Sequence, residues 1–355
     1  MANAGLPAGG APAALPEPPR FRAYRELGPR PNIIVDGAPL ASTVLTLSHW
    51  PNNRTPEALK RDTSTETVYA YLDAPRYHRS APWVSNNHFD EDGLFSMFAL
   101  CDPETALTHR ELLTDASRAG DFGVFASREA ARLCFAVEGC ADPDRSPLPA
   151  ATFAGCERQR TARLYPAMLD RLPRLLADLP GHRALWEEQD RFLADSLAVL
   201  AAGEAQIEEL PELDLALVWL PEEQPLRTAR RYLRAESCAL HPYALNTATA
   251  RTRLLLIQGQ RYELQLRYEG WVQLASRRPA PRVALEPLAA RLNERERAPG
   301  DWRAEPVSEV LPRLYLDGTS QSSLASGPFI DLLLDYLRSA PPAWDPYDCA
   351  GSGSG

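Results

Sequence analysis

The first third of the chain alternates short apolar runs, each ending in polar residues, with segments of helical periodicity. β-prone runs predict strands at 32–37, 43–47 and 82–85. A polar loop and then a helical pattern follow these runs, as in an α/β domain. In open α/β sheets ligands bind at the carboxyl ends of the strands, so the polar residues after these runs are the first candidates for a functional site.

Helical periodicity marks the segments between and after these strands. Helices are expected at 63–72, from Leu94 onward, over 104–139, at 156–176 and at 181–204. The last of these carries an apolar stripe of the kind that packs into a core. We therefore expect the N-terminal part to be an open α/β sheet with a helical segment attached.

The second half of the chain predicts a further, smaller α/β unit. Strands are expected at 213–220, 253–257, 262–267 and 271–275. Helices are expected at 285–296 and 328–338. The fold class predicted for the whole chain is therefore α/β, with an open N-terminal sheet followed by a smaller domain.

These patterns divide the chain into four parts. Residues 1–30 are rich in Ala, Gly and Pro, and we expect a disordered N-terminal tail there. A first α/β domain with a helical extension is expected over 31–205, and a second over 206–345. The segment 346–355 ends in alternating Gly and Ser, which is typical of a flexible tail.

Composition and charge narrow the classes of function. With a net charge of −9 and Lys60 as the only lysine, the chain is not expected to bind duplex nucleic acid or a membrane surface. It has no apolar run as long as a membrane span and no glycine-rich phosphate loop with a lysine. The six cysteines lack Cys-x-x-Cys and zinc-finger spacings, which favours reduced thiols in a cytoplasmic protein.

The loop after the third expected strand suggests chemistry. His88, Asp90 and Asp92 occupy alternate positions, so in an extended loop their side chains point the same way. One imidazole and two carboxylates suit a divalent cation such as Mn²⁺ or Mg²⁺. Gly93 follows, where the backbone can turn sharply or approach a ligand closely. The alternative is a solvated turn in which Asp92 caps a helix that starts near Leu94.

Arginines in the second half are candidates for phosphate binding. Arg277, Arg278 and Arg282 flank a Pro-rich segment, and guanidinium groups match phosphate in a bidentate way. The alternative is a solvated loop between a strand and a helix. Nearly all the positive charge of the chain is arginine, as GC-rich bacterial coding produces, so the abundance of arginine is by itself weak evidence for phosphate recognition.

Two segments resemble motifs of the DHH phosphoesterase superfamily, which are metal-dependent hydrolases of phosphodiester and phosphoanhydride bonds. The stretch His88-Phe-Asp90-Glu-Asp92-Gly93-Leu-Phe-Ser96 is similar to their first motif, His-x-Asp-x-Asp-Gly-hydrophobic-x-Ser. Their third motif is a strand ending in Asp-His-His, then a Pro/Asn-rich loop and a helix, and residues 45–72 are similar to it in outline. The resemblance covers about residues 32–125.

The chain departs from the superfamily pattern in four ways. The order of the two motifs is reversed, Ser48 stands where the aspartate of the third motif would be, and only His49 remains of its histidine pair. The glycine-rich Gly-Gly-His motif of the second domain is also missing from the sequence. The resemblance therefore implies a rearranged or distant relative.

The resemblance implies a set of metal ligands. Asp90 and Asp92 would bind one or two Mn²⁺ or Mg²⁺ ions, and His88 and His49 would complete the coordination. Asp36, at the end of the first expected strand, and Asp121 are candidates for further carboxylate ligands. For Asp121 the alternative is a cap in the turn Gly-Asp-Phe-Gly that follows a helix.

The resemblance also implies a function. It predicts a metal-dependent phosphoesterase that hydrolyses a small phosphorylated molecule or a short oligonucleotide, with Asp90, Asp92 and His88 at the catalytic site. The first alternative is a non-catalytic binding protein on a degenerate scaffold of the same type. The second is a metal-dependent hydrolase that acts on another kind of bond.

Overall fold

The computed structural model describes residues 17–231 and 234–348. Part of the expected N-terminal tail, residues 1–16, lies outside this description. The expectation of disorder is wrong for residues 17–30, because Arg20–Phe21 forms strand β1 and Tyr24–Glu26 forms a 3₁₀ turn. At the other end, residues 349–355 lie outside the described part, whereas the hydroxyl of Tyr347 donates a hydrogen bond to the carbonyl of Leu274.

The N-terminal sheet has four parallel strands in the order β1-β4-β2-β3. The three strands predicted for this part of the chain are present: β2 spans Asn32–Val35, β3 spans Thr43–Leu47 and β4 spans Trp83–Ser85. Every residue of β2 is buried, as expected for a parallel strand covered on both faces. Because all the strands run the same way, their carboxyl ends lie on one edge of the sheet.

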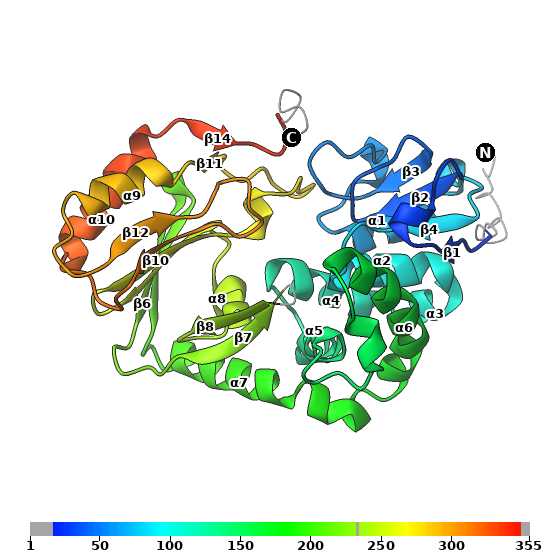
Figure 1. Ribbon diagram of the computed structural model, residues 1–355, viewed down its shortest axis with the longest axis horizontal. Helices are drawn as coiled ribbons and strands as arrows, with labels where there is room; N and C mark the ends of the chain where they lie inside the picture. The colour runs from blue at the N-terminus through cyan, green and yellow to red at the C-terminus, as the bar shows by residue number, and fades with distance from the viewer. Residues whose placement is uncertain (1–16, 232–233, 349–355) are drawn as a thin grey trace, which may run out of the picture.

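Helices pack around this sheet and extend below it in Figure 1. They are α1 (Ser64–Leu72), α2 (Glu91–Cys101), α3 (Pro103–Thr108), α4 (Arg110–Phe122), α5 (Arg128–Ala141), α6 (Glu157–Ala177) and α7 (Glu187–Ala201). The helical pattern expected over 104–139 is thus divided among α3, α4 and α5, since His109 departs from helical geometry and Gly123 adopts a left-handed conformation. One apolar core joins the sheet to these helices.

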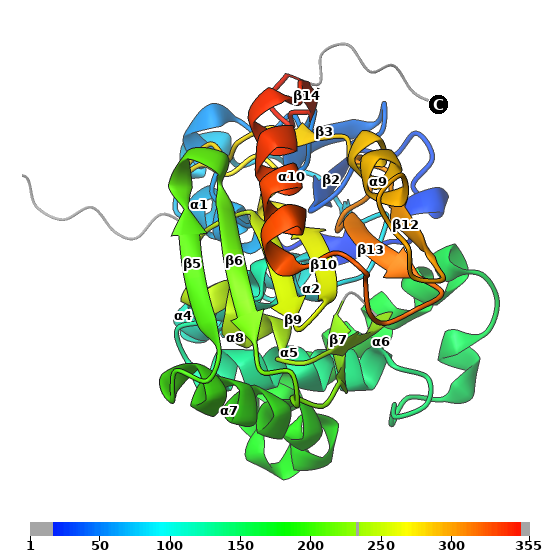
Figure 2. The ribbon, with the colours of Figure 1, turned by 90° about the vertical axis from the view of Figure 1, so that its left-hand side faces the viewer.

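The second sheet has six strands in the order β12-β13-β10-β9-β6-β5, and only β6 and β9 are parallel. Their bounds are β5 Gln206–Leu210, β6 Leu215–Leu220, β9 Arg253–Gln258, β10 Arg261–Leu266, β12 Asp301–Ala304 and β13 Arg313–Asp317. Helices α9 (Glu286–Asn293) and α10 (Ser326–Ser339) cover one face of it, as Figure 2 shows. The fold is therefore mixed α/β, as predicted.

The expected strand at 271–275 does not exist. A 3₁₀ turn, Tyr268–Gly270, occupies the approach to it, and Val272 and Leu274 are buried against Phe122 rather than paired in a sheet. Alternating apolar residues at 272 and 274 mimic a half-buried strand, but here they anchor a loop to a separate small core. This loop lies where the two halves of the molecule meet.

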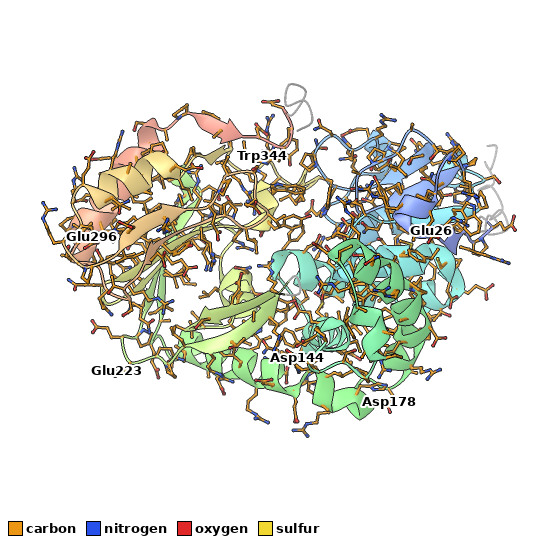
Figure 3. The ribbon with its side chains drawn as sticks, viewed as in Figure 1. Glu26, Asp144, Asp178, Glu223, Glu296 and Trp344 are labelled. Atoms are coloured by element: carbon orange, nitrogen blue, oxygen red, sulfur yellow. The ribbon has the colours of Figure 1, made fainter. Side chains whose placement is uncertain are left out.

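Several contacts join the two halves. The β7–β8 hairpin (Arg227–Arg231 and Arg234–Cys238) and helix α8 (Pro242–Ala248) come from the second half but contact α4, α5 or α7. The amide of Gln273 donates to the carbonyl of His49. Strands β11 (Arg282–Val283) and β14 (Pro342–Trp344) form a short antiparallel pair, and the ring of Trp344 stacks on that of Trp271. Figure 3 labels Trp344 beside the gap between the halves. The boundary at residue 206 stays a prediction.

None of the helices within residues 17–231 and 234–348 has both the length and the apolar character that crossing a membrane requires.

Candidate metal centre

Polar residues that follow three parallel strands converge at one edge of the N-terminal sheet. Asp36 follows β2 directly, His49 lies just beyond the end of β3, and the loop with His88 and Asp90 joins β4 to α2. The backbone of Asp36 has a φ of 44°, in the left-handed region. That conformation costs a non-glycine residue about 1–2 kcal/mol, and such strain is concentrated at functional sites.

Asp36 belongs to two groups of potential metal ligands, and each of its carboxylate oxygens faces a different imidazole. Its Oδ1 lies 3.4 Å from Nε2 of His49, and its Oδ2 lies 3.2 Å from Nε2 of His88. Asp92 completes the first group and Asp90 the second. Within each group the ligand atoms lie within 4.8 Å of one another. The two groups of potential ligands are therefore adjacent and share the Asp36 carboxylate.

Asp121 lies beside the first group. Its Oδ2 is 3.4 Å from Nε2 of His49, and its side chain is buried. It belongs to the last turn of α4, and the chain reverses direction at Gly123, which has a φ of 65°. The alternative that Asp121 caps a turn after the helix is therefore wrong.

The ring of His49 is oriented by a backbone contact. Its Nδ1 lies 2.5 Å from the carbonyl oxygen of Asp62, which can only accept a hydrogen bond. We therefore assign the N–H to Nδ1, which leaves the lone pair of Nε2 directed at the carboxylates. Histidines that bind metals are commonly held in this way, with the other ring nitrogen donating to a carbonyl or carboxylate.

Asp92 is held by the N-terminus of α1. Its Oδ2 accepts from the amide of Ser64 at 2.7 Å, and its Oδ1 accepts from the amide of Thr65 at 2.8 Å. A capping box between Thr63 and Glu66 begins this helix and fixes the two free amides in place. The first turn of a helix favours negative charge, so α1 both positions and stabilises the Asp92 carboxylate.

Asp90 has two roles at the start of α2. Its Oδ1 accepts from the amide of Gly93 at 2.8 Å, which makes it the N-cap of a helix that begins at Glu91. Its Oδ2 is 2.8 Å from Nε2 of His88. The expected cap at Asp92 is therefore wrong by two residues, because the helix starts earlier than Leu94.

Burial of this many charged groups shifts their pKa values. Burial and the charge of Asp36 raise the pKa of Asp92 to about 7, and burial with the charge of Asp92 raises the pKa of Asp121 well above its usual range. Burial opposes charge on Asp36 too, but its contacts with His49 and His88 hold the pKa of Asp36 below its ordinary value. Burial lowers the pKa of both imidazoles, but the nearby carboxylates more than offset this and leave it raised.

These shifts predict how stability depends on pH when no metal is bound. The pKa of Asp92 is about 7 in the folded protein and 3.8 when unperturbed, so between these values the folded state binds an extra proton. The stability gained from this proton, and that gained from the protonated forms of His49 and His88, is lost as pH rises. Urea denaturation in chelator should therefore give a free energy of unfolding that falls between about pH 5 and about pH 8. Asp92→Asn should reduce this fall, and a stability that rises over the same range would contradict the assignment.

A cavity of about 620 Å³ lies over the second group of ligands. His88, Asp90 and Trp50 line it from the first half of the chain, and the β7–β8 hairpin and the segment 305–313 line it from the second half. The ring of Trp50 packs against His88, with 4.8 Å between their centroids. The second ligand group therefore meets open space where the two halves face each other, through His88 and Asp90.

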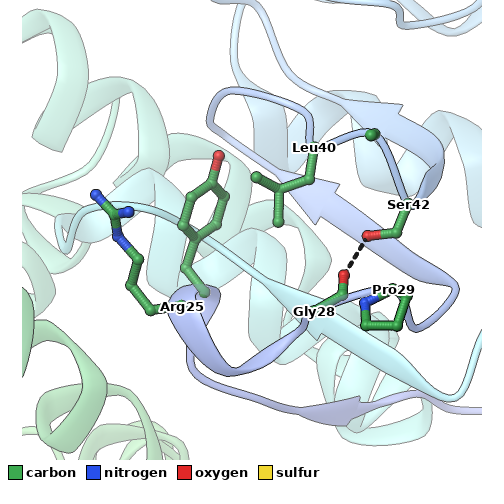
Figure 4. A pocket seen from close by; sticks show the side chains of 7 residues that line it. Arg25, Gly28, Pro29, Leu40 and Ser42 are labelled. Carbon is green, nitrogen blue, oxygen red and sulfur yellow. Dashed lines mark hydrogen bonds between the residues drawn. The ribbon is translucent and has the colours of Figure 1, made fainter.

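Another cavity, of about 640 Å³, lies away from these groups, between the segments 24–29 and 40–42. Figure 4 shows its side chains, with the hydroxyl of Ser42 donating to the carbonyl of Gly28. Its lining residues include Arg25 but no carboxylate and no histidine. It has none of the chemistry of a metal site.

A scan against protein-family models matched residues 17–348 to one family, whose description is a family of unknown function, DUF6687. The chain belongs to the DUF6687 family. Neither the curated proteins nor the solved structures gave a match. Membership of DUF6687 carries no stated activity, so the resemblance to DHH phosphoesterases rests on the motif residues and stays a prediction.

The structure of this DUF6687 member gives the three candidate phosphate ligands other surroundings. Arg278 is exposed and pairs with Asp345 at 2.7 Å. Arg282 is buried and donates to main-chain carbonyls, among them that of Glu309. Arg277, Arg278 and Arg282 are all absent from the residues that line the cavity over His88. The guanidinium groups of Arg278 and Arg282 are thus engaged by groups of the protein itself. A phosphate site needs donors that face a cavity.

Other charged residues face this cavity and were missed from the sequence. They include Glu138 and Asp142 at the end of α5, Arg230 and Arg231 on β7, and Arg313 on β13. The sequence of residues 227–238 predicts no strand, so the arginines of the DUF6687 hairpin could not be placed at the same cavity as the acidic loop. The two segments line the same cavity although they are more than a hundred positions apart in the chain, and no local pattern indicates this.

Proposed function

We propose that the chain is a metal-dependent phosphoesterase with a two-metal site centred on Asp36. The observation that carries the proposal is the shared carboxylate: one Asp36 oxygen faces His49, and the other faces His88. Paired divalent ions about 3.5–4 Å apart are a recurrent arrangement in phosphatases and nucleases. The similarity of residues 88–96 to the first DHH motif supports phosphoester hydrolysis over other hydrolytic chemistry.

The donor set fits Mn²⁺ or Mg²⁺. Carboxylate oxygens and imidazole nitrogens suit hard or borderline cations, and cysteine is absent from both ligand groups. Four buried carboxylates around two imidazoles concentrate negative charge that a cation would compensate. Bound metal would lower the pKa of water and neutralise charge on phosphoryl oxygens.

Each side chain then has a defined task. His49, Asp92 and Asp121 would hold one ion, His88 and Asp90 the other, and Asp36 both. The amides of Ser64 and Thr65 at the N-terminus of α1 would keep Asp92 in place beside its ion.

The cavity indicates the size of the substrate. Its volume of about 620 Å³ is within the range of small-molecule sites, about 300–1,000 Å³. It suits a small phosphorylated molecule or the end of a short oligonucleotide, and the net charge of −9 disfavours duplex nucleic acid. We also propose a cytoplasmic location, which the free thiols of the five described cysteines support.

The test is hydrolysis of a generic phosphodiester and a panel of small nucleotides with Mn²⁺. Wild type should turn over, and Asp92→Asn should lose at least about 100-fold in rate, since a metal ligand is removed. Asp73→Asn, which changes an exposed carboxylate paired with Arg110, serves as the matched control and should retain activity. If wild type neither hydrolyses these esters nor binds Mn²⁺ tightly, the chain is a non-catalytic protein with an acidic loop.

A further inference from the structure

Helix α5 places a buried carboxyl group on the wall of the cavity. Glu138 lines the same cavity as His88 and Asp90, yet its side chain is only 4% exposed. Within the described part of the chain, its Oε2 is buried and has no hydrogen-bond partner. A buried carboxyl oxygen without a partner is costly, and such groups persist where they serve a function.

The surroundings of Glu138 favour its neutral form. Burial, followed by the charge of Glu91 on α2, raises the pKa of Glu138 well above its usual range. Opposing cations are Arg231 and Arg230 on β7 and Arg145 beyond the end of α5, and they do not reverse the shift. Two neutral groups complete these surroundings, Cys134 on α5 and Tyr243 on α8. A neutral carboxyl at the edge of a site for anions can donate a proton.

Three other carboxylates of the cavity are paired with an arginine or exposed to solvent. Asp142 pairs with Arg230 at 2.9 Å, and Glu305 pairs with Arg313 at 3.2 Å. Glu157 also lines the cavity but is exposed to solvent. Glu138 therefore combines burial, a free oxygen and access to the cavity.

We propose that Glu138 is the catalytic acid that protonates the leaving group of the phosphoester. The inference rests on the proposed phosphoesterase function. Water adds to phosphorus and forms one P–O bond, while the P–O bond to the leaving group breaks and its electron pair stays on the leaving oxygen. That oxygen takes the proton of Glu138, the proton lost by the water passes to solvent, and the Glu138 carboxylate regains a proton from solvent.

The need for an acid depends on the leaving group, and this provides a selective test. The leaving group of a dinucleotide is an alkoxide, which requires a proton, whereas that of a p-nitrophenyl alkyl phosphate is a stable phenolate. Glu138→Gln should lower turnover of the dinucleotide by about 100-fold or more, in line with the usual contribution of general acids, and change that of the aryl ester less than about threefold. Glu138→Asp keeps an acid and should recover part of the dinucleotide activity.

Glu129→Gln is the matched control, because it changes an exposed carboxylate in the first turn of the same helix, α5, away from the cavity. It should leave both esters unaffected. Mn²⁺ binding measured by calorimetry should be the same in wild type and Glu138→Gln, and difference infrared spectra should show that the variant lacks one protonated carboxyl band. These two readouts are independent of turnover, and an unchanged carboxyl band would overturn the proposal.

Each outcome decides a separate question. Equal loss on both esters with intact Mn²⁺ binding would show that Glu138 supports the site in another way, and no loss on the dinucleotide would show that it has no part; either result overturns the proposal. A wild-type protein that hydrolyses neither ester refutes the phosphoesterase function itself, and the role of Glu138 falls with it.

Discussion

Asp36→Asn is expected to lower Mn²⁺-supported turnover by at least about 1,000-fold, because one change weakens both cation sites. Asp36 offers one oxygen toward His49 and the other toward His88. An amide keeps the shape of the carboxylate but loses its charge and replaces one oxygen with a donor, which repels a cation. Steady-state kinetics at saturating Mn²⁺ measure the effect.

A comparison with Asp121→Asn tests whether the loss of turnover in Asp36→Asn arises because Asp36 serves both cation sites. Asp121 lies beside only one of the two groups, so its loss should cost less than that of Asp36. Asp335→Asn changes an exposed carboxylate near Arg338 and should behave as wild type. Equal effects at Asp36 and Asp121 would mean that Asp36 is not shared between two ions.

Gly93→Ala is expected to destabilise the fold by about 1–3 kcal/mol, the usual cost of overpacking a tight site. A Cβ on Gly93 would lie 2.5 Å from Nδ2 of Asn86, 2.6 Å from the hydroxyl of Tyr165 and 2.9 Å from Oδ1 of Asp90. The last contact is the N-cap of α2, so the change should also displace Asp90 and weaken Mn²⁺ binding. Chemical denaturation and calorimetry measure these two effects.

Gly327→Ala is the control for this prediction. Gly327 lies in helix α10, and a Cβ there would meet no atom within 4 Å. Alanine favours a helix over glycine by about 1 kcal/mol, so this variant should be as stable as wild type or slightly more stable. If Gly93→Ala is as stable to chemical denaturation as Gly327→Ala, the start of α2 is not closely packed around Gly93.

The N-terminal strands could be predicted from the sequence because their signals are local. Buried apolar runs bounded by polar loops gave β2, β3 and β4 to within two residues at each end. The hairpin at 227–238 was missed, because Arg-rich strands carry no apolar alternation. The false strand at 271–275 arose for the opposite reason, since Val272 and Leu274 alternate but are buried in a loop.

The candidate site could be predicted in part. The rule that parallel strands end on one edge was enough to bring Asp36, His49 and the loop with His88 together, and the structure places them in contact. The residues on the far wall of the cavity, such as Glu138, could not be predicted. Their position depends on how the two halves of the chain pack, which no short pattern encodes.

The most direct test of the account is the number and coupling of bound Mn²⁺ ions. Metal-free protein would be titrated with Mn²⁺, and the bound ions counted by elemental analysis and examined by electron paramagnetic resonance. The shared Asp36 carboxylate predicts two ions per chain with a spin-coupled spectrum. A single uncoupled ion, or none bound tightly, would contradict the two-metal centre.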